Sequence, residues 1–172
     1  MSAGSSPSVR TIDSPIGRLR IEVSNGRLNA IRFLDDGDRS APDRSAGRED
    51  EVVLEAAVAQ LSEYFAGERR DFDLPLTVLG GTTFQHQVWG RLRSVAFGTT
   101  STYGQLAGAM GLTGHGSRAV GGANGRNPIP IVVPCHRVIG ADGRLTGYAG
   151  GLERKQWLLA HERGEQPPPL PL

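Results

Sequence analysis

The residues best suited to chemistry in this chain are two neighbours, Cys135 and His136. A cysteine thiolate is a strong nucleophile, and a nearby imidazole can help to form it. Cys135 is the only cysteine among 172 residues, which excludes an intramolecular disulfide and a zinc site built from several cysteines. The cysteine is therefore either a nucleophile or a small buried apolar residue, and the rest of the sequence has to decide between the two.

The composition predicts a globular protein without a membrane span. With 38% hydrophobic and 22% charged residues, the chain is long enough for one ordinary domain or two small ones. It contains no long apolar stretch, and residues 1–7 lack the basic end and the apolar core of a secretory signal. Together with the single thiol, these features lead us to expect a cytoplasmic protein.

The charge of the chain says little about its partners. The formal net charge is +1, which by itself does not suggest nucleic acid. Lys155 is the only lysine, and arginine, which supplies the rest of the strongly basic residues, suits phosphate and base contacts. A GC-rich genome explains an arginine-rich chain equally well, so both explanations stay open.

The first half of the chain predicts a small antiparallel sheet with one helix. Residues 9–34 alternate in polarity around an Asn25-Gly26 turn, which indicates a β-hairpin. Residues 35–50 are polar and predict a mobile loop, and residues 51–66 carry apolar side chains at helical spacing. Residues 72–78 alternate as a strand would.

The second half of the chain is mainly helical, and Gly80-Gly81 is the best candidate for a boundary between the halves. The sequence therefore predicts an α+β protein with a small N-terminal sheet and helix, followed by a mainly helical domain. We expect an N-terminal α/β domain at 1–80, a C-terminal domain at 81–165 and a Pro-rich tail at 166–172. The helices of the second half are expected around residues 84–92, 102–110, 117–124 and 152–162.

The helices at 102–110 and 117–124 suggest a helix-turn-helix, although short helix pairs also occur as simple packing units. After Arg118, the second of them consists almost entirely of small residues. An α-helix is roughly 10 Å across and the minor groove of DNA only about 6 Å wide, so a helix that approaches this groove needs a small-residue face. The alternative is a loop, or a helix packed tightly against a neighbour.

Several segments in order carry a resemblance to one protein family. They are Phe84-Gln85, Val88-Trp89, Thr102-Tyr103-Gly104, Arg118-Ala119-Val120-Gly121, Asn127-Pro128-Ile129-Pro130, Pro134-Cys135-His136-Arg137-Val138, Thr146-Gly147-Tyr148 and Trp157–Glu162. With these segments, the chain resembles the O6-alkylguanine-DNA alkyltransferases, which repair DNA by direct reversal. The dense matching runs from Phe84 to Glu162, and the N-terminal half resembles the smaller domain of the family more loosely.

The resemblance implies a set of catalytic residues. Cys135 would accept the alkyl group from guanine O6, and His136 would act as its base through a bound water. Glu162 would orient His136, and Asn127 would brace the active-site turn. The hydroxyl of Tyr103 and backbone N–H groups near Tyr148 are candidates to stabilise the departing guanine oxygen. A His⁺–Glu⁻ pair beside the thiol is expected to lower the pKa of Cys135. The interpretation of Cys135 as the acceptor also requires a thiol that is not closed off from solvent.

The resemblance also implies contacts to DNA and to the damaged base. Arg118 would fill the space that a flipped nucleotide leaves, and Tyr103 would press on the nearby phosphate and reach the base. Ala119, Gly122 and Ala123 would form the small-residue face at the DNA. The guanine pocket would be lined by Tyr148, Ala149, Val138 and Pro130.

The expected partner is double-stranded DNA that carries O6-alkylguanine, bound from the minor groove without sequence preference. The expected reaction transfers one alkyl group irreversibly, because water does not readily cleave the thioether. We expect no cofactor, no metal and a monomer, and cooperative binding along DNA stays open. Some relatives bind zinc through N-terminal cysteines, which this chain lacks.

The chain departs from the family pattern in three places, one of which is Ala96-Phe97-Gly98, where a Pro-aromatic-Gly is common. The segment from Tyr103 to Arg118 is one residue longer, with Thr113–Gly116 in the extra loop, and Ala149 stands where some members have serine. Three alternatives remain: a damage binder without chemistry, a helix-turn-helix regulator and a cysteine hydrolase. Damage binders of this kind lack the acceptor cysteine, which is present here as Cys135. A regulator would not need Cys135, His136 and Glu162 together. A hydrolase would not need the small-residue helix that begins near Arg118.

Overall fold

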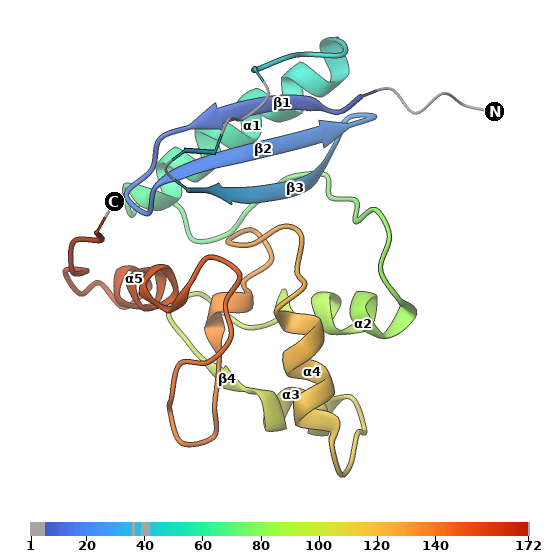
Figure 1. Ribbon diagram of the computed structural model, residues 1–172, viewed down its shortest axis with the longest axis vertical. Helices are drawn as coiled ribbons and strands as arrows, with labels where there is room; N and C mark the ends of the chain where they lie inside the picture. The colour runs from blue at the N-terminus through green and yellow to red at the C-terminus, as the bar shows by residue number, and fades with distance from the viewer. Residues whose placement is uncertain (1–5, 36, 39–41, 172) are drawn as a thin grey trace. The chain divides into compact units, whose positions relative to one another are not determined.

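The computed structural model describes residues 6–35, 37–38 and 42–171. The chain forms two compact units, and the boundary between them in the sequence lies between Leu79 and Gly80 (Figure 1). Residues 36 and 39–41 of the expected loop, residues 1–5 and residue 172 of the tail lie outside the described residues. Within the described ranges, none of the helices combines the length and apolar character that crossing a bilayer requires.

The first unit is built on a three-stranded antiparallel sheet. Its strands β1 (Ser8–Ile12), β2 (Arg18–Ser24) and β3 (Arg27–Leu34) lie in the order β1-β2-β3 (Figure 1). The predicted hairpin is confirmed, because Asn25 and Gly26 join β2 to β3 with φ angles of 52° and 65°. A tight turn with two left-handed residues matches the twist of the strands, and asparagine and glycine tolerate this conformation best.

Helix α1 (Arg48–Phe65) packs against all three strands. Its buried residues Leu54, Ala57 and Leu61 repeat at helical spacing, as the sequence predicts. The helix nevertheless begins three residues before the predicted start at residue 51, so the prediction of a loop up to Asp50 is wrong at its C-terminal end.

Asp50 explains the early start of α1. Its buried carboxylate accepts hydrogen bonds from Ser8 Oγ at 2.8 Å and from the Gly26 backbone N–H at 2.7 Å. Just before the helix, the backbone of Arg44 pairs with that of Val9 on β1, at 2.7 and 3.0 Å. The first turn of the helix is therefore tied to the first strand and to the hairpin turn at once.

The strand predicted at residues 72–78 does not form, and this prediction is wrong. The segment makes only an isolated bridge to β3, in which Leu28 donates to Pro75 O at 2.8 Å and Thr77 donates to Leu28 O at 3.0 Å. Pro75 has no N–H group, so it cannot donate to a regular ladder. Alternating polarity shows which side chains are buried, and it does not guarantee a paired backbone.

The second unit is mainly helical, as predicted. It contains α2 (Thr83–Leu92), α3 (Tyr103–Ala109), α4 (Gly116–Asn124), a 3-10 turn at Cys135–Arg137 and α5 (Leu152–Glu162). Capping boxes, in which a threonine and a glutamine exchange hydrogen bonds, start both α2 and α3. A short parallel ladder between β4 (Ser101–Thr102) and β5 (Val138–Ile139) is an addition that the sequence did not predict.

Helices α3 and α4 pack against each other, and α4 also packs against α2. The connection between α3 and α4 turns through Gly111 and Gly114, whose φ angles are 71° and 60°. At Gly116, the first residue of α4, a Cβ atom would lie 2.7 Å from the Cβ of Leu112. This position needs glycine because the turn and the helix approach each other too closely for a side chain.

The buried carboxylate of Asp50 leads to a prediction about stability. We expect Asp50→Ala to lower the free energy of unfolding by about 2–3 kcal/mol, because a charged acceptor is lost and the Gly26 N–H is left unpaired. Urea denaturation measures the change. Glu55→Ala, an exposed carboxylate of the same helix, is the control and should stay within about 0.5 kcal/mol of the unmodified protein. Equal effects of the two substitutions would contradict the anchoring role.

Candidate active site

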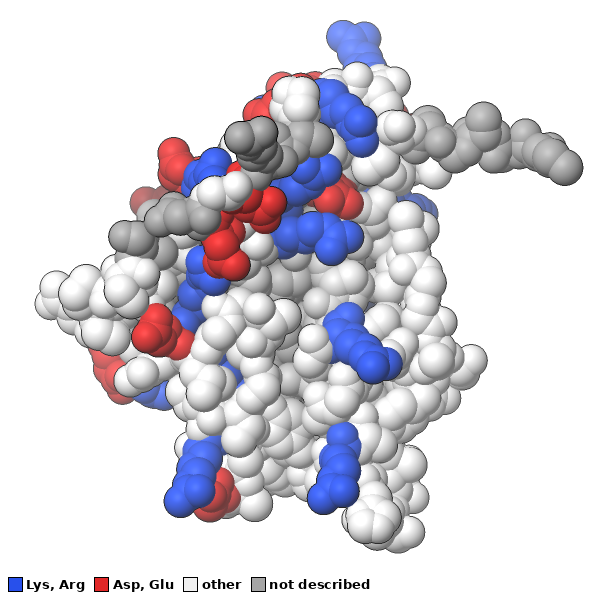
Figure 2. Space-filling model, in the orientation of Figure 1, with Lys and Arg blue, Asp and Glu red and all other residues white. Residues whose placement is uncertain are grey.

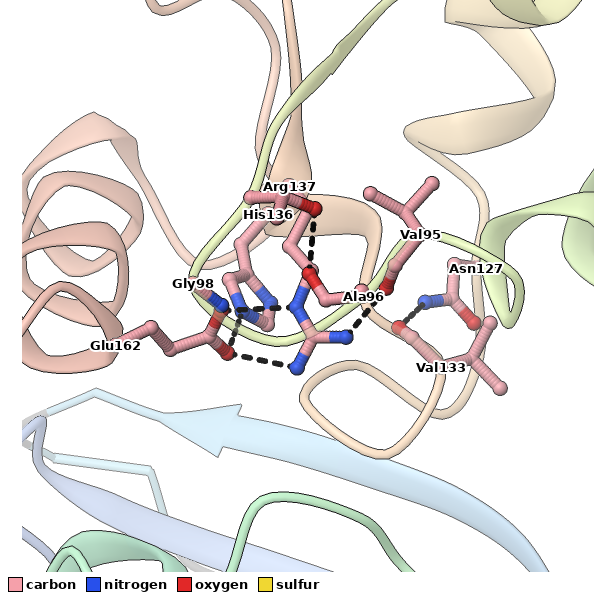
Figure 3. Close-up of polar contacts among 9 residues, drawn as sticks. Val95, Ala96, Gly98, Asn127, Val133, His136, Arg137 and Glu162 are labelled. Carbon is pink, nitrogen blue, oxygen red and sulfur yellow. Dashed lines mark hydrogen bonds and ion pairs between the residues drawn. The ribbon is translucent and has the colours of Figure 1, made fainter.

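The turn that leads to Cys135 is held by the side chain of Asn127. Its Nδ2 donates to Val133 O at 2.7 Å (Figure 3). Its Oδ1 accepts from the backbone N–H of Ile129 at 3.1 Å. Between these contacts, Ile131 has a φ angle of 74°, a left-handed conformation that a β-branched residue rarely adopts. Such backbone strain costs on the order of 1–3 kcal/mol and persists only where the surroundings enforce it. The buried amide of Asn127 supplies this enforcement.

Cys135 begins the 3-10 turn, and the next residue points to the end of α5. The ring of His136 is fully buried, and its Nε2 lies 2.7 Å from Glu162 Oε1 (Figure 3). His136 and Glu162 are 26 residues apart in sequence, so the structure brings together the two residues that the motifs single out. Because Nε2 faces a carboxylate, it carries the proton, and Nδ1 is left as an acceptor in the neutral ring.

Both carboxylate oxygens of Glu162 accept hydrogen bonds from neighbouring residues. His136 Nε2 and Arg137 Nη2 contact Oε1 at 2.7 and 2.9 Å. Arg137 Nε and the Gly98 backbone N–H contact Oε2 at 2.8 and 3.2 Å (Figure 3). Gly98 fits because its φ angle is 74° and a Cβ atom there would lie 3.1 Å from the Glu162 carbonyl oxygen.

Arg137 is a site residue that the sequence analysis missed. Besides gripping Glu162 with two nitrogens, it donates from Nη1 to Val95 O at 2.6 Å, and its side chain is 7% exposed. The fork of a guanidinium matches a carboxylate in this way, whereas a lysine does not. The position of Arg137 directly after His136 in the motif was a signal that could have identified it.

The electrostatics of this cluster keep Glu162 ionised. Burial by itself would raise the pKa of Glu162, but hydrogen bonds and charges from His136 and Arg137 outweigh it and hold the pKa well below its ordinary range. Burial lowers the pKa of His136 below 6.5, against the opposing pull of Glu162. At neutral pH the pair is therefore a neutral imidazole that donates to a carboxylate.

The predicted effect on the thiol is wrong. Cys135 is only 4% exposed, and burial raises its pKa to about 11, in spite of smaller opposing effects from Asn127 and Lys155. Desolvation disfavours the thiolate more strongly than the neighbouring groups favour it. The expectation of a thiol open to solvent is also wrong for this structure, in which the sulfur is a protonated group beneath the surface.

Lys155 is the second residue that the sequence analysis missed. It is fully buried on α5, and its Nζ donates to Val138 O at 2.6 Å, to Thr146 O at 2.9 Å and to Tyr103 Oη at 3.5 Å. Burial lowers the pKa of Lys155 to about 8, and the nearby Cys135 opposes the shift. Its status as the only lysine of the chain was the available signal.

The residues expected around the base occupy different depths. Tyr103 is the first residue of α3 and donates its hydroxyl proton to Thr146 O at 3.0 Å, so it contacts the segment that precedes Tyr148. Tyr148 is partly buried and Ala149 is exposed. Val138 and Pro130 are buried in the same unit.

The surface of α4 is small and open. Arg118, Ala119 and Gly122 are exposed, and a Cβ atom at Gly122 would meet nothing within 4 Å among the described residues. The packing of the protein itself therefore gives no reason for glycine there. Ala123 corrects a prediction, because it lies on the buried side of α4, where its carbonyl oxygen accepts from Trp89 Nε1 at 2.9 Å.

Charge is distributed unevenly between the two parts of the sequence. Residues 1–79 contain fourteen acidic and ten basic residues, whereas residues 80–172 contain four acidic and nine basic ones. Between residues 80 and 141 there is no aspartate or glutamate at all. Figure 2 shows both signs crowded together over the strands of the first unit. The near-zero net charge thus hides a basic second unit, which suits a polyanionic partner.

Comparisons with known proteins identify the class of this fold and site. Residues 83–164 match the family model "6-O-methylguanine DNA methyltransferase, DNA binding domain", and residues 9–78 match the "ribonuclease-like domain" of the same family. The methylated-DNA–protein-cysteine methyltransferase of Mycolicibacterium paratuberculosis is 49% identical over 163 residues, which cover 95% of this chain and 96% of that protein. The chain therefore belongs to the 6-O-methylguanine DNA methyltransferase family.

Solved structures agree with this assignment. The Mycobacterium tuberculosis OGT in complex with DNA has a TM-score of 0.80 and 46% identity, over 93% of this chain and 95% of that one. The O6-methylguanine DNA methyltransferase from Methanococcus jannaschii has a TM-score of 0.65 at 27% identity, over 92% and 94% of the two chains. The α+β fold expected from the sequence is confirmed.

The paired Glu162 and His136 lead to a prediction about acid stability. In the folded protein their pKa values lie below the ordinary 4.5 and 6.5, so the unfolded chain takes up protons first as the pH falls. We expect the free energy of unfolding of the second unit to fall by on the order of 2 kcal/mol between pH 7 and pH 4. Urea titrations followed by the fluorescence of Trp89 and Trp157, the only tryptophans, measure this unit selectively.

A matched variant isolates the contribution of the histidine. His136→Gln keeps a side-chain N–H for Glu162 but cannot titrate, so its stability should depend less steeply on pH between 7 and 5. A second unit that becomes more stable on acidification would contradict the assigned pKa directions.

Proposed function

We propose that this protein is a methylated-DNA–protein-cysteine S-methyltransferase that repairs O6-alkylguanine in duplex DNA, with Cys135 as the acceptor. The observation that carries the proposal is the contact of His136 Nε2 with Glu162 Oε1 at 2.7 Å. His136 directly follows Cys135, the only cysteine of the chain. Membership of the 6-O-methylguanine DNA methyltransferase family, over both units, supports it. No cofactor takes part. The protein acts as a monomer, in a cytoplasm that keeps the thiol reduced.

The thiol loses its proton only when it reacts. Because the pKa of Cys135 is about 11, the thiolate is scarce at neutral pH, and a base has to take the proton. Nδ1 of His136 is the acceptor atom and receives the proton through a bridging water. Glu162 stabilises the imidazolium that forms, and the buried ammonium of Lys155 offsets the charge on sulfur.

The transfer itself exchanges one bond for another. The sulfur of Cys135 attacks the alkyl carbon, the S–C bond forms, and the bond from this carbon to guanine O6 breaks. The electron pair returns to the purine, where the hydroxyl of Tyr103 and backbone N–H groups around Tyr148 stabilise it. The thioether is stable in water, so one protein molecule repairs one lesion.

DNA reaches this site through α4. The target atom lies inside the duplex, so the nucleotide is flipped out at a cost of a few kcal/mol, and Arg118 fills the space that it leaves. The exposed face of Ala119 and Gly122 lets the helix approach the minor groove. Because Cys135 is buried, the segment around Tyr148 moves to admit the base. Contacts to phosphates make binding independent of sequence and sensitive to salt.

Mass spectrometry of the intact protein tests the reaction. After incubation with a duplex that carries O6-methylguanine, we expect the protein to gain one methyl group on Cys135, with activity ending at one equivalent. Cys135→Ser should still bind the duplex and gain nothing. Continued turnover on an ester would favour a hydrolase instead, and unchanged mass with tight binding to a specific operator would favour a regulator.

The open face of α4 gives a prediction about DNA affinity. Gly122→Leu should weaken binding to duplex DNA by about tenfold or more, equivalent to about 1.4 kcal/mol, because the side chain holds the helix away from the groove. Its rate with the free base O6-methylguanine should stay close to that of the unmodified protein. Fluorescence anisotropy measures the binding.

Gly90→Leu is the matched control for this experiment. Gly90 is also an exposed helical glycine at which a Cβ atom would meet no described atom within 4 Å, but it lies on α2. Leucine should strengthen both helices slightly, since glycine is a poor helix former. Equal losses of DNA affinity in the two variants would remove the specific role of the α4 face.

A further inference from the structure

A second buried amide contacts the acceptor cysteine. Asn124, the last residue of α4, is 1% exposed, and its Nδ2 donates to the backbone carbonyl of Cys135 at 3.3 Å. A carbonyl oxygen can only accept, so the nitrogen must face it, and the oxygen Oδ1 is turned to the other side of the amide. Asn124 was not among the residues that the sequence or the family resemblance singled out.

Two buried acceptor atoms of this neighbourhood have no hydrogen-bond partner within the described part of the chain. They are Asn124 Oδ1 and His136 Nδ1. Asn124 contacts the carbonyl of Cys135, and His136 is the next residue along the chain. Buried polar atoms of native proteins are almost always satisfied by protein or by ordered water. An amide oxygen cannot donate, and neither can Nδ1 in the tautomer that donates from Nε2 to Glu162, so a water molecule is a suitable donor to both.

We propose that Asn124 is a positioning residue of the acceptor site, whose Oδ1 accepts a hydrogen bond from the water that joins Cys135 to His136. This inference rests on the proposed function and deepens it. One water supplies two donors and one acceptor site for this purpose. The Cys135 thiol donates to the water oxygen, and the two water hydrogens go to His136 Nδ1 and to Asn124 Oδ1.

The same arrangement works on both sides of the proton transfer. When the thiol proton moves to the water and a water proton moves to His136 Nδ1, the new N–H donates back to the water oxygen. The two water hydrogens then go to the sulfur anion and again to Asn124 Oδ1. Because an amide oxygen keeps its role as acceptor throughout, it occupies one water hydrogen and leaves the other for exchange between sulfur and imidazole. Asn124 therefore sets the orientation of the relay, and Glu162 receives no proton.

A purely structural role for Asn124 makes a different prediction. Its Nδ2 holds the Cys135 carbonyl, but this end of α4 is also fixed by the bond from Trp89 Nε1 to Ala123 O. Loss of a structural contact would lower the rate by the same factor at every pH. Loss of Asn124 Oδ1 as the acceptor for the water slows only the removal of the thiol proton through the water and His136. At high pH, hydroxide can remove this proton instead.

The test compares pH profiles of single-turnover transfer from the free base O6-methylguanine, which does not depend on DNA binding. Asn124→Leu should react about tenfold or more slowly near pH 7, and the deficit should shrink as the pH rises toward the thiol pKa of about 11. Asn29→Leu is the control, because Asn29 is a buried amide of the first unit that bonds to Ser24. Its rate and profile should match those of the unmodified protein. A loss in Asn124→Leu that is constant with pH, or no loss, would overturn the proposal.

A high-resolution crystal structure of the unmodified protein gives an independent answer, also if the variant does not fold. We expect a water within about 2.6–3.2 Å of both Asn124 Oδ1 and His136 Nδ1. A site in which Oδ1 meets a protein donor, or in which the water contacts His136 alone, would overturn the inference. Failure of the unmodified protein to acquire a methyl group on Cys135 would instead refute the proposed function.

Discussion

The candidate active site depends on one buried carboxylate. Glu162 is the last residue of α5, and its hydrogen bonds join that helix to the 3-10 turn through His136 and Arg137, and to the loop before β4 through Gly98. A buried charge is tolerated only when opposite charge and donors surround it. Three segments that are distant in sequence must therefore meet at this point before the carboxylate can be buried. The positions of His136 and of the cysteine beside it follow from that requirement.

Two buried cations, Arg137 and Lys155, have different electrostatic effects in this site. Arg137 keeps Glu162 anionic without taking part in proton transfer, so the imidazole gains a fixed hydrogen-bond acceptor and one free nitrogen. Lys155, on the same helix as Glu162, places positive charge near the sulfur and holds the backbone of Val138 and Thr146. Its lowered pKa shows that burial works against this charge. In the proposed reaction, this arrangement favours charge separation when the proton moves, whereas the resting site stays neutral at sulfur and imidazole.

Much of this could be predicted from the sequence, because some signals are local. The Asn25-Gly26 turn and the apolar spacing of α1 and α2 predict the local backbone directly. The order of the motifs singles out Cys135, His136 and Glu162 as site candidates, and the structure brings His136 and Glu162 into contact. Other features depend on the tertiary environment. The start of α1 is set by the contacts of Asp50 with Ser8 and Gly26, and the 72–78 segment is limited by the missing N–H of Pro75. The direction of the Cys135 pKa shift depends on burial, which no motif encodes, and for the same reason Ala123 was assigned to the wrong side of its helix.

The depth of the sulfur has a consequence for the lifetime of the molecule. A protein that is consumed by one reaction gains nothing from a thiol that peroxides and circulating electrophiles can reach. Sulfenic acid formation and adventitious alkylation both proceed through the thiolate, and they slow down when the sulfur is protonated and shielded. Cys135, the proposed acceptor, is 4% exposed and has a pKa of about 11, so it is held in a form that reacts slowly with such compounds. Selectivity then depends on which molecules can gain access to the buried sulfur, and not on the intrinsic reactivity of the sulfur.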